Sequence, residues 1–190
     1  MKFAKGGSLL KYLMKHRNQI NEEQIRGVMI QMLLTLDLMH RRGIYHRDIK
    51  PDNVLILDDS DSELQVCIAD LGLACRASDT NDLAFKCGTP GYVAPELLKG
   101  FPFRAKSDIF SLGSMFYNMV TGKMLFSGND SHQILFKNKY LDTSSIIDTT
   151  CQHISKDCRD LLKKMTISNP DHRLSVEESL EHDWFKKDRD

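Results

Sequence analysis

The sequence predicts a mainly helical single domain that carries one small β-hairpin. Two patterns indicate this fold class. Apolar residues recur at three- and four-residue steps over much of the chain, and two short β-rich runs flank an acidic turn. With 190 residues, of which 41% are hydrophobic and 27% charged, the chain can bury a sizeable core, as a soluble globular protein does.

The N-terminal part of the chain predicts two helices. Ser8 can cap a short helix over residues 9–16. Asn21 begins a second helix, and Gln24 three residues later completes a capping-box pattern. The apolar face of this second helix is formed by Ile25, Val28, Met29, Met32, Leu36 and Met39. Because these residues recur at helical spacing, we expect them in the core.

Two β-rich runs, residues 54–57 and 65–69, predict the hairpin. The residues between them, 58–63, are mostly acidic and indicate an exposed turn. A calcium-binding loop is the weaker interpretation, because the central Gly and distal Glu of an EF-hand are lacking. Residues 70–96 then show neither helical nor strand periodicity, and a compact domain rarely contains such a long irregular stretch without a functional reason.

The C-terminal half predicts a central helix and three further helices. Residues 109–121 are apolar on most faces, so we expect this helix to be buried. Ser107 or Asp108 is predicted to cap its start, and Gly122 its end. The further helices are predicted to begin at Ser131, Ser155 and Ser175.

Composition and charge argue against several kinds of partner. Lys+Arg and Asp+Glu are equal at 26 each, so attraction to nucleic acid or an anionic membrane is not indicated. The longest uncharged stretch, residues 109–122, is too short to span a bilayer. The N-terminus lacks the apolar core of a signal peptide, so we expect a cytoplasmic protein. The five cysteines include no Cys-x-x-Cys pair, which favours free thiols over a metal site.

The densest polar stretch is residues 46–53, His-Arg-Asp-Ile-Lys-Pro-Asp-Asn. Burying charges without partners is costly, so we expect a loop that presents a site. Asp48 is the candidate general base of this site. Lys50 lies two residues later, so in an extended loop its ammonium points the same way. Asn53 and Asp70 supply the oxygen ligands that Mg²⁺ prefers.

The order of the motifs is more specific than any one of them. The Asp-x4-Asn spacing of the polar loop precedes Asp-Leu-Gly at 70–72, Gly-Thr-Pro-Gly-Tyr-Val-Ala-Pro-Glu at 88–96 and Asp-Ile-Phe-Ser-Leu-Gly at 108–113. This series resembles the large, C-terminal lobe of the serine/threonine protein kinases over essentially the whole chain. The string at 88–96 and the terminal His-Asp-Trp-Phe are most similar to the calcium/calmodulin-dependent kinase group.

The resemblance implies roles for individual residues. The catalytic residues would be Asp48, Lys50 and Asn53. ATP would be bound by Ala4, Lys50, Asp52, Asn53 and Asp70, and Mg²⁺ by Asn53 and Asp70. Thr89 would position the substrate hydroxyl. Structural support would come from His46, Arg47, Glu96, Asp108 and Arg173, where Glu96 and Arg173 form a buried ion pair and Asp108 is a helix cap that fastens the loop.

The resemblance also implies a domain organisation: a hinge at 1–7, a catalytic loop at 46–53, an activation segment at 70–96 and a helical remainder at 97–187. The Gly-rich loop and strand lysine of the family's small lobe are not found, so we expect the chain to begin at the hinge and to need a small-lobe or regulatory partner.

The implied reaction is transfer of the γ-phosphate of ATP to serine or threonine hydroxyls of a protein substrate. The alternative is a catalytically silent kinase-like scaffold or interaction module. Phe85 stands where many members of the family carry a phosphorylatable Thr, so Arg47 is expected to lack a phosphate partner from that position.

Overall fold

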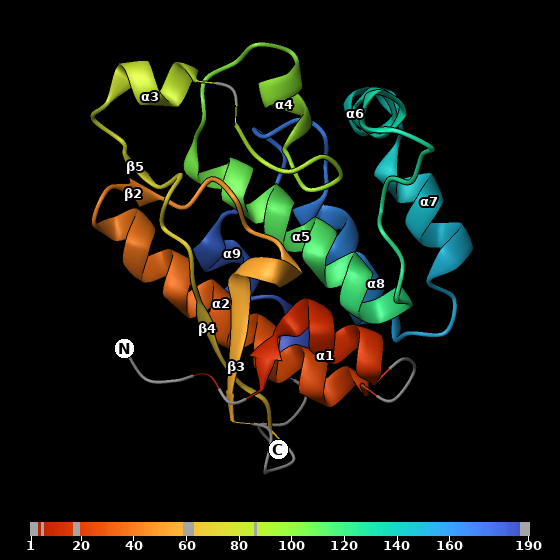
Figure 1. Ribbon diagram of the computed structural model, residues 1–190. Coiled ribbons are helices and arrows are strands. Elements are labelled where there is room, and N and C mark those ends of the chain that lie inside the picture. The colour runs from red at the N-terminus through yellow and green to blue at the C-terminus, as the bar shows by residue number, and fades with distance from the viewer. Residues whose placement is uncertain (1–3, 5, 17–19, 59–62, 86, 187–190) are drawn as a thin grey trace.

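A computed structural model of the chain describes residues 4, 6–16, 20–58, 63–85 and 87–186 (Figure 1). Its helices are α1 (Leu9–Lys15), α2 (Glu22–Arg41), α3 (Thr80–Ala84), α4 (Pro95–Leu98), α5 (Ala105–Thr121), α6 (Ser131–Tyr140), α7 (Thr143–Thr150), α8 (Lys156–Met165) and α9 (Val176–Leu180), with 3-10 turns η1 (Pro51–Asn53) and η2 (Asp183–Phe185). Its strands are β1 (Gly7–Ser8), β2 (Ile44–Tyr45), β3 (Val54–Asp58), β4 (Gln65–Ile68) and β5 (Cys75–Arg76). The mainly helical fold class with a small hairpin is confirmed for these residues.

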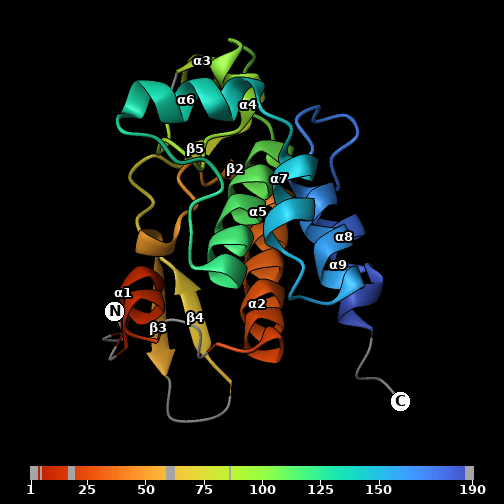
Figure 2. The same cartoon turned by 90° about the vertical axis from the view of Figure 1, so that its right-hand side faces the viewer.

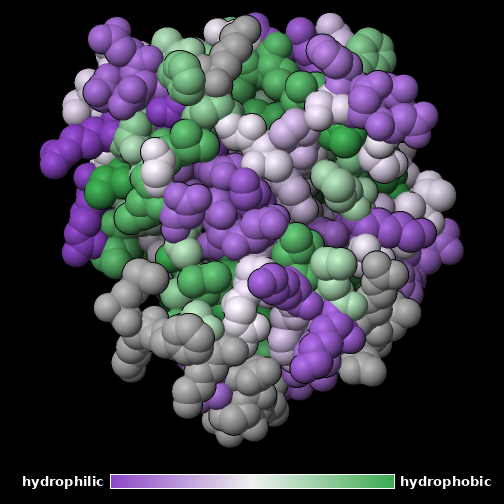
Figure 3. Space-filling view, in the orientation of Figure 1, coloured by the Kyte–Doolittle hydropathy of each residue, from purple (hydrophilic) through white to green (hydrophobic). Residues whose placement is uncertain are grey.

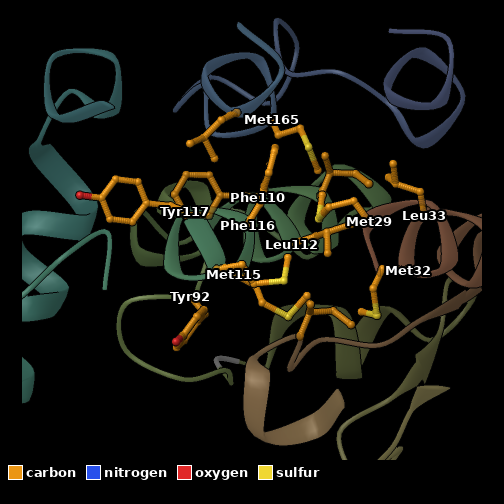
Figure 4. Packing of buried hydrophobic residues seen from close by; sticks show 14 of the residues in the cluster. Met29, Met32, Leu33, Tyr92, Phe110, Leu112, Met115, Phe116, Tyr117 and Met165 are labelled. Atoms are coloured by element: carbon orange, nitrogen blue, oxygen red, sulfur yellow. The ribbon is translucent and has the colours of Figure 1, made fainter. Parts of the chain in front are cut away.

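Helix α5 is the centre of the fold. It contacts α2 on one side and α8 on the other, and Figure 2 shows it between the hairpin and the C-terminal helices. In the close view of Figure 4, apolar side chains of α5 lie between Met29 and Met32 of α2 and Met165 of α8. Each of these three methionines is at most 1% exposed. The prediction of a central buried helix is therefore confirmed.

The predicted start of this central helix is wrong. Helix α5 begins at Ala105, four residues earlier than expected, and Arg104 is its N-cap. Ser107 donates its hydroxyl to Glu96, 2.9 Å away, and the carboxylate of Asp108 accepts hydrogen bonds from the polar loop. Ser107 also accepts the backbone N–H of Arg104 at 3.3 Å, so it takes part in the capping box from the N3 position, while Asp108 binds the polar loop. The predicted end is confirmed, since Gly122 is its left-handed C-cap at φ 66°.

The first two helices begin where their caps predict. Ser8 accepts a hydrogen bond from the backbone of Lys11, and α1 follows it. Asn21 and Gln24 form the reciprocal capping box of α2. The predicted apolar face of α2 lies in the core, with Met39 partly buried at its edge.

One carboxylate at the start of α2 holds the C-terminal part of the chain. Oε1 of Glu22 accepts hydrogen bonds from the Ser155 hydroxyl at 2.6 Å and from the Trp184 indole at 2.7 Å. Its Oε2 accepts the backbone N–H of Ser155 at 3.0 Å. Trp184 is fully buried, and its ring lies 5.0 Å from that of Phe116 on α5. Glu22 therefore joins α2, the start of α8 and η2.

The predicted hairpin forms with nearly the expected bounds. Strands β3 and β4 pair antiparallel, with Val54 opposite Ile68, and β1 pairs with the other edge of β3. Residues 59–62 of the predicted acidic turn lie outside the described residues. Across the described part of the chain, no three His, Cys, Asp or Glu residues group as they would around a metal ion.

Residues 70–96 are more regular than the sequence predicts. Strand β5 pairs antiparallel with β2, and Asp79 caps α3 by accepting the backbone N–H of Asp82 at 3.1 Å. These elements have only two and five residues, so no periodicity can reveal them. Helix α7 was also not predicted, because its sequence, Thr-Ser-Ser-Ile-Ile-Asp-Thr-Thr, consists of weak helix formers.

The predicted starts of three further helices are confirmed. Helices α6, α8 and α9 start at or directly after Ser131, Ser155 and Ser175, and Glu178 completes the capping box of α9. All five cysteines are free thiols. Within the described residues, no helix combines the length and the apolar character that a bilayer crossing requires.

Candidate active site

The backbone of the polar loop is held by one buried carboxylate. The loop connects β2 to η1 and crosses in front of α5 in Figure 1. Asp108 on α5 is 0% exposed, and its two oxygens accept the backbone N–H groups of His46 at 3.0 Å and Arg47 at 2.9 Å. Arg47 has a φ of 73°, a left-handed conformation that is costly for a residue with a side chain. The two hydrogen bonds to Asp108 stabilise the loop in this strained form.

The ring of His46 fixes the loop beside the end of β4. Its Nδ1 accepts the backbone N–H of Asp48 at 3.3 Å, so Nε2 carries the hydrogen and donates to the carbonyl of Ala69 at 3.2 Å. The backbone N–H of Ala69 in turn donates to the carbonyl of Asn53 at 2.7 Å. The loop and the start of the segment at Asp70 therefore lie side by side.

The carboxylate of Asp48 collects three side-chain donors. Its Oδ1 accepts the hydroxyl of Thr89 at 2.7 Å, and its Oδ2 lies 2.7 Å from Nζ of Lys50 and 3.0 Å from Nδ2 of Asn53. Lys50 also donates to the Thr89 hydroxyl at 2.8 Å. Asp48 is only 8% exposed. These four residues lie up to about forty positions apart in the sequence and form one cluster. Within it, the ammonium of Lys50 balances the negative charge of Asp48.

This cluster determines the ionisation of Asp48. Burial alone raises the pKa of the carboxyl group. Hydrogen bonds from Lys50, Thr89 and Asn53, together with the charge of Lys50, outweigh burial and hold the pKa of Asp48 below its usual value. The group is therefore an ionised hydrogen-bond acceptor at neutral pH.

The oxygen donors predicted for Mg²⁺ lie on these neighbouring segments. Nδ2 of Asn53 donates to the backbone carbonyl and the carboxylate of Asp48, which leaves its Oδ1 for a ligand. Asp70 is exposed, has a φ of 61° and uses Oδ1 to accept the backbone N–H of Gly72 at 3.1 Å. Mg²⁺ takes hard oxygen ligands and commonly uses one or two protein carboxylates beside phosphate oxygens. An amide oxygen and an exposed carboxylate fit that ion.

Asp52 and Ala4 are the other two residues that were predicted to contact the nucleotide. Asp52 is exposed. The burial of Tyr92, together with the nearby negative charge of Asp52, raises the pKa of Tyr92 to about 12. Ala4 is partly buried, while residues 1–3 and 5 of the predicted hinge lie outside the described residues.

Figure 3 shows hydrophilic residues gathered near the centre of the face seen in Figure 1, with hydrophobic residues around them. A polar centre on this face suits a charged ligand.

A second buried cluster lies at the end of the 70–96 segment. Arg173 is 1% exposed and donates from both terminal nitrogens to the two oxygens of Glu96, each at 2.8 Å. Its remaining N–H groups donate to the backbone carbonyls of Ile167, Lys106 and Ser168. The guanidinium also lies over the ring of Phe110, 5.0 Å from its centroid. This bidentate pair, predicted from the resemblance, therefore has the geometry that repays desolvation.

Arg47 is buried on the opposite side of the same segment but has no such partner. Its Nη2 donates to the backbone carbonyl of Phe85 at 2.9 Å and to the thiol of Cys87 at 2.8 Å. The guanidinium lies 5.9 Å from the ring of Phe103. Its Nε is buried without a hydrogen-bond partner, and no carboxylate among the described residues forms an ion pair with it. Neutral groups therefore surround this cation.

Two polar residues that contact this region were not predicted from the sequence. Ser114 of α5 donates to the carbonyl of Gly91, and Asn138 of α6 donates to the carbonyl of Val93. Both are 1% exposed. Neither belongs to a recognisable motif, and only the tertiary fold brings them to residues 91 and 93.

The chain is similar in sequence to known proteins. The sequence matches the family model described as "Protein kinase domain" over residues 1–185. It is 35% identical to the serine/threonine-protein kinase ATG1b of Arabidopsis thaliana, across 97% of this chain and 26% of that protein. It is also 35% identical to the carbon catabolite-derepressing protein kinase of Saccharomyces cerevisiae, across 96% of this chain and 28% of that protein.

A third relative is the SNF1-related protein kinase catalytic subunit alpha KIN12 of Arabidopsis thaliana, 32% identical across 97% of this chain and 35% of that protein. The chain thus spans between about a quarter and about a third of the length of these curated relatives.

Proposed function

Because this chain belongs to the protein kinase domain family, we propose that it transfers the γ-phosphate of ATP to serine and threonine hydroxyls of protein substrates. One observation carries the proposal: the carboxylate of Asp48 is held at once by Lys50, Thr89 and Asn53 in an ionised form. The three relatives named above are all protein kinases by name, and one is named a serine/threonine kinase. Their names support this choice of reaction.

In this proposal Asp48 orients the acceptor. Oδ1 of Asp48 accepts the Thr89 hydroxyl and has a further lone pair, whereas Oδ2 is already bound by Lys50 and Asn53. The acceptor hydroxyl can therefore donate to Oδ1 without displacing Thr89. As the hydroxyl oxygen bonds to the γ-phosphorus, the bond from that phosphorus to the bridging oxygen breaks and ADP leaves with the electron pair. The hydroxyl proton passes to Asp48.

The cations and their ligands have distinct tasks. The ammonium of Lys50, between Asp48 and Thr89, is placed to offset negative charge that develops on the transferred group. Asn53 and Asp70 would hold Mg²⁺ through Oδ1 and a carboxylate oxygen. Bound Mg²⁺ would supply neutralisation of the phosphate oxygens.

We further propose that the described helices form the large lobe of the kinase fold. Residues 1–7 would be the hinge, with Ala4 and Asp52 near the nucleotide, and residues 70–96 the activation segment. A small lobe would cover the other side of the nucleotide. The motif strings at 88–96 and 182–185 support a relation to the calcium/calmodulin-dependent group, although the relatives named above carry other names.

Replacement of the proposed base tests the assignment. In the full-length protein, Asp48→Asn should lower transfer of labelled phosphate to casein by a factor of about 10² to 10⁴, because the amide cannot accept the proton. Asp37→Asn is the matched control, since Asp37 lies on α2 and, among the residues that the structure describes, pairs with Arg41 alone. Undiminished transfer by Asp48→Asn would contradict the proposal. A wild-type protein that binds ATP but phosphorylates no acceptor would favour the scaffold alternative.

A further inference from the structure

Two buried polar side chains have no task in the mechanism above. Ser114 lies in the middle of α5, and its hydroxyl donates to the carbonyl of Gly91 at 2.7 Å. Asn138 lies on α6, and its Nδ2 donates to the carbonyl of Val93 at 2.8 Å. Each is 1% exposed. Two different helices therefore reach the same short segment, and both bind its backbone.

The segment that they hold is a tight turn. The backbone N–H groups of Tyr92 and Val93 both donate to the carbonyl of Thr89, at 3.0 and 3.1 Å. Gly91 has a φ of 91°, and a Cβ built there would lie 2.5 Å from Cε of Met124. The positive φ therefore requires glycine at 91, and the side chain of Met124 lies close to the turn.

This turn begins at the residue that contacts the reacting groups. The hydroxyl of Thr89 donates to Asp48 at 2.7 Å and accepts from Lys50 at 2.8 Å. Any shift of the backbone at 89–93 is therefore transmitted directly to the Asp48 carboxylate. Displacements of about 1 Å at positioning groups can reduce catalysis strongly.

Asn138 binds the turn through one end of its amide. Its Nδ2 is paired, but its Oδ1 is buried without a hydrogen-bond partner. An apolar side chain of the same size would avoid the unpaired Oδ1 but would remove the donor to the carbonyl of Val93. What Asn138 contributes is therefore its bond to the backbone of the turn.

From these contacts we propose that Ser114 and Asn138 are positioning residues, which hold the turn at 89–93 in the place where a protein substrate presents its hydroxyl to Asp48. The inference rests on the proposed kinase function and adds residues to it. Both act through the backbone of the turn and touch neither ATP nor the acceptor.

The test compares substrate kinetics with the order of the turn. In the full-length protein, Ser114→Ala and Asn138→Leu should each raise KM for casein by about two- to tenfold, the effect of losing one hydrogen bond. The KM for ATP should stay within about twofold, because no ATP contact is removed. Hydrogen exchange should become faster at the amides of Tyr92 and Val93, because their turn loses an anchor.

Ser111→Ala is the matched control. Ser111 lies on α5 one turn before Ser114, is also buried, and donates only to the carbonyl of Ser107 in its own helix, at 3.2 Å. It should change neither KM nor exchange at residues 92 and 93. The inference is overturned when Ser114→Ala and Asn138→Leu behave like this control in both measurements. Faster exchange in a protein that never phosphorylates casein would instead overturn the kinase assignment and the substrate role, and leave the anchoring of the turn established.

Discussion

Two buried arginines hold the 70–96 segment in different ways. Arg173 binds the carboxylate of Glu96 through two hydrogen bonds, each with a nitrogen–oxygen distance of 2.8 Å. Arg47 binds the carbonyl of Phe85 and the thiol of Cys87, both neutral groups. The two are 1% and 5% exposed, so their desolvation is similar. What differs is the charge of the partner.

Burial does not by itself make an arginine hold a segment of the chain firmly. A desolvated guanidinium is stabilising only when ionised and hydrogen-bonded partners repay the loss of water. Arg173 has these partners, together with three backbone carbonyls. Arg47 retains an unpaired Nε, and burial raises the pKa of the Cys87 thiol more than Arg47 lowers it. Glu96 is therefore held firmly at the end of the segment, and the contacts of Arg47 with Phe85 and Cys87 are weak.

The largest effect is expected from breaking the strong pair. Glu96→Ala should lower the free energy of unfolding by about 3–5 kcal/mol, because Arg173 is left buried and unpaired. Urea denaturation measures the change. The double variant Glu96→Leu with Arg173→Met removes both charges and should cost less than the single change. A loss below about 1 kcal/mol for Glu96→Ala would show that the pair is no stronger than a surface ion pair.

A smaller effect is expected from the stretch between the two arginines. Thr89→Val removes a hydrogen bond to the ionised Asp48, so kcat/KM should fall by about tenfold at neutral pH, the value of one such bond. The bond lowers the pKa of Asp48, so its loss should raise that pKa and move the acid limb of the kcat/KM profile to higher pH. Thr89→Ser retains the hydroxyl and is the control. An unchanged acid limb would mean that Thr89 does not act through Asp48.

The smallest effect is expected at the weak site. Arg47→Met should change the free energy of unfolding by no more than about 1 kcal/mol, because the neutral partners lose little and the unpaired Nε disappears. Arg173→Met, measured in the same urea titration, provides the contrast and should cost several times more. Equal losses in the two variants would show that Arg47 has an ionic partner after all.

The sequence predicted the parts of the fold that local chemistry specifies. Asn21 with Gln24 and Ser175 with Glu178 begin helices because capping boxes satisfy backbone N–H groups within a few residues. The long apolar face of α2 and the apolar run of α5 are strong periodic signals. The site residues were suggested by motif order, and the structure brings Lys50, Asn53 and Thr89 within hydrogen-bonding distance of Asp48.

The failures of prediction come from side chains with distant partners. Ser107 and Asp108 were predicted as N-caps, but the helix begins four residues earlier than expected, at Ala105. Ser107 is the N3 residue of the capping box and also donates to Glu96, and Asp108 binds the polar loop. Ser114 and Asn138 carry no local signal, because their role depends on where residues 91 and 93 lie after folding. Such contacts join segments that only tertiary structure brings together.

The Glu22 carboxylate has a consequence for the time course of folding. Glu22 binds Ser155 and Trp184, which lie 133 and 162 positions further along the chain. Its hydrogen bonds therefore enclose most of the sequence in one loop. Closing loops of that length costs entropy before any contact is gained, and proteins rich in such long-range contacts fold slowly. An interaction that forms late acts mainly on the rate of unfolding. We therefore expect the bonds of Glu22 to affect how long the folded chain persists more than how quickly the folded state is reached.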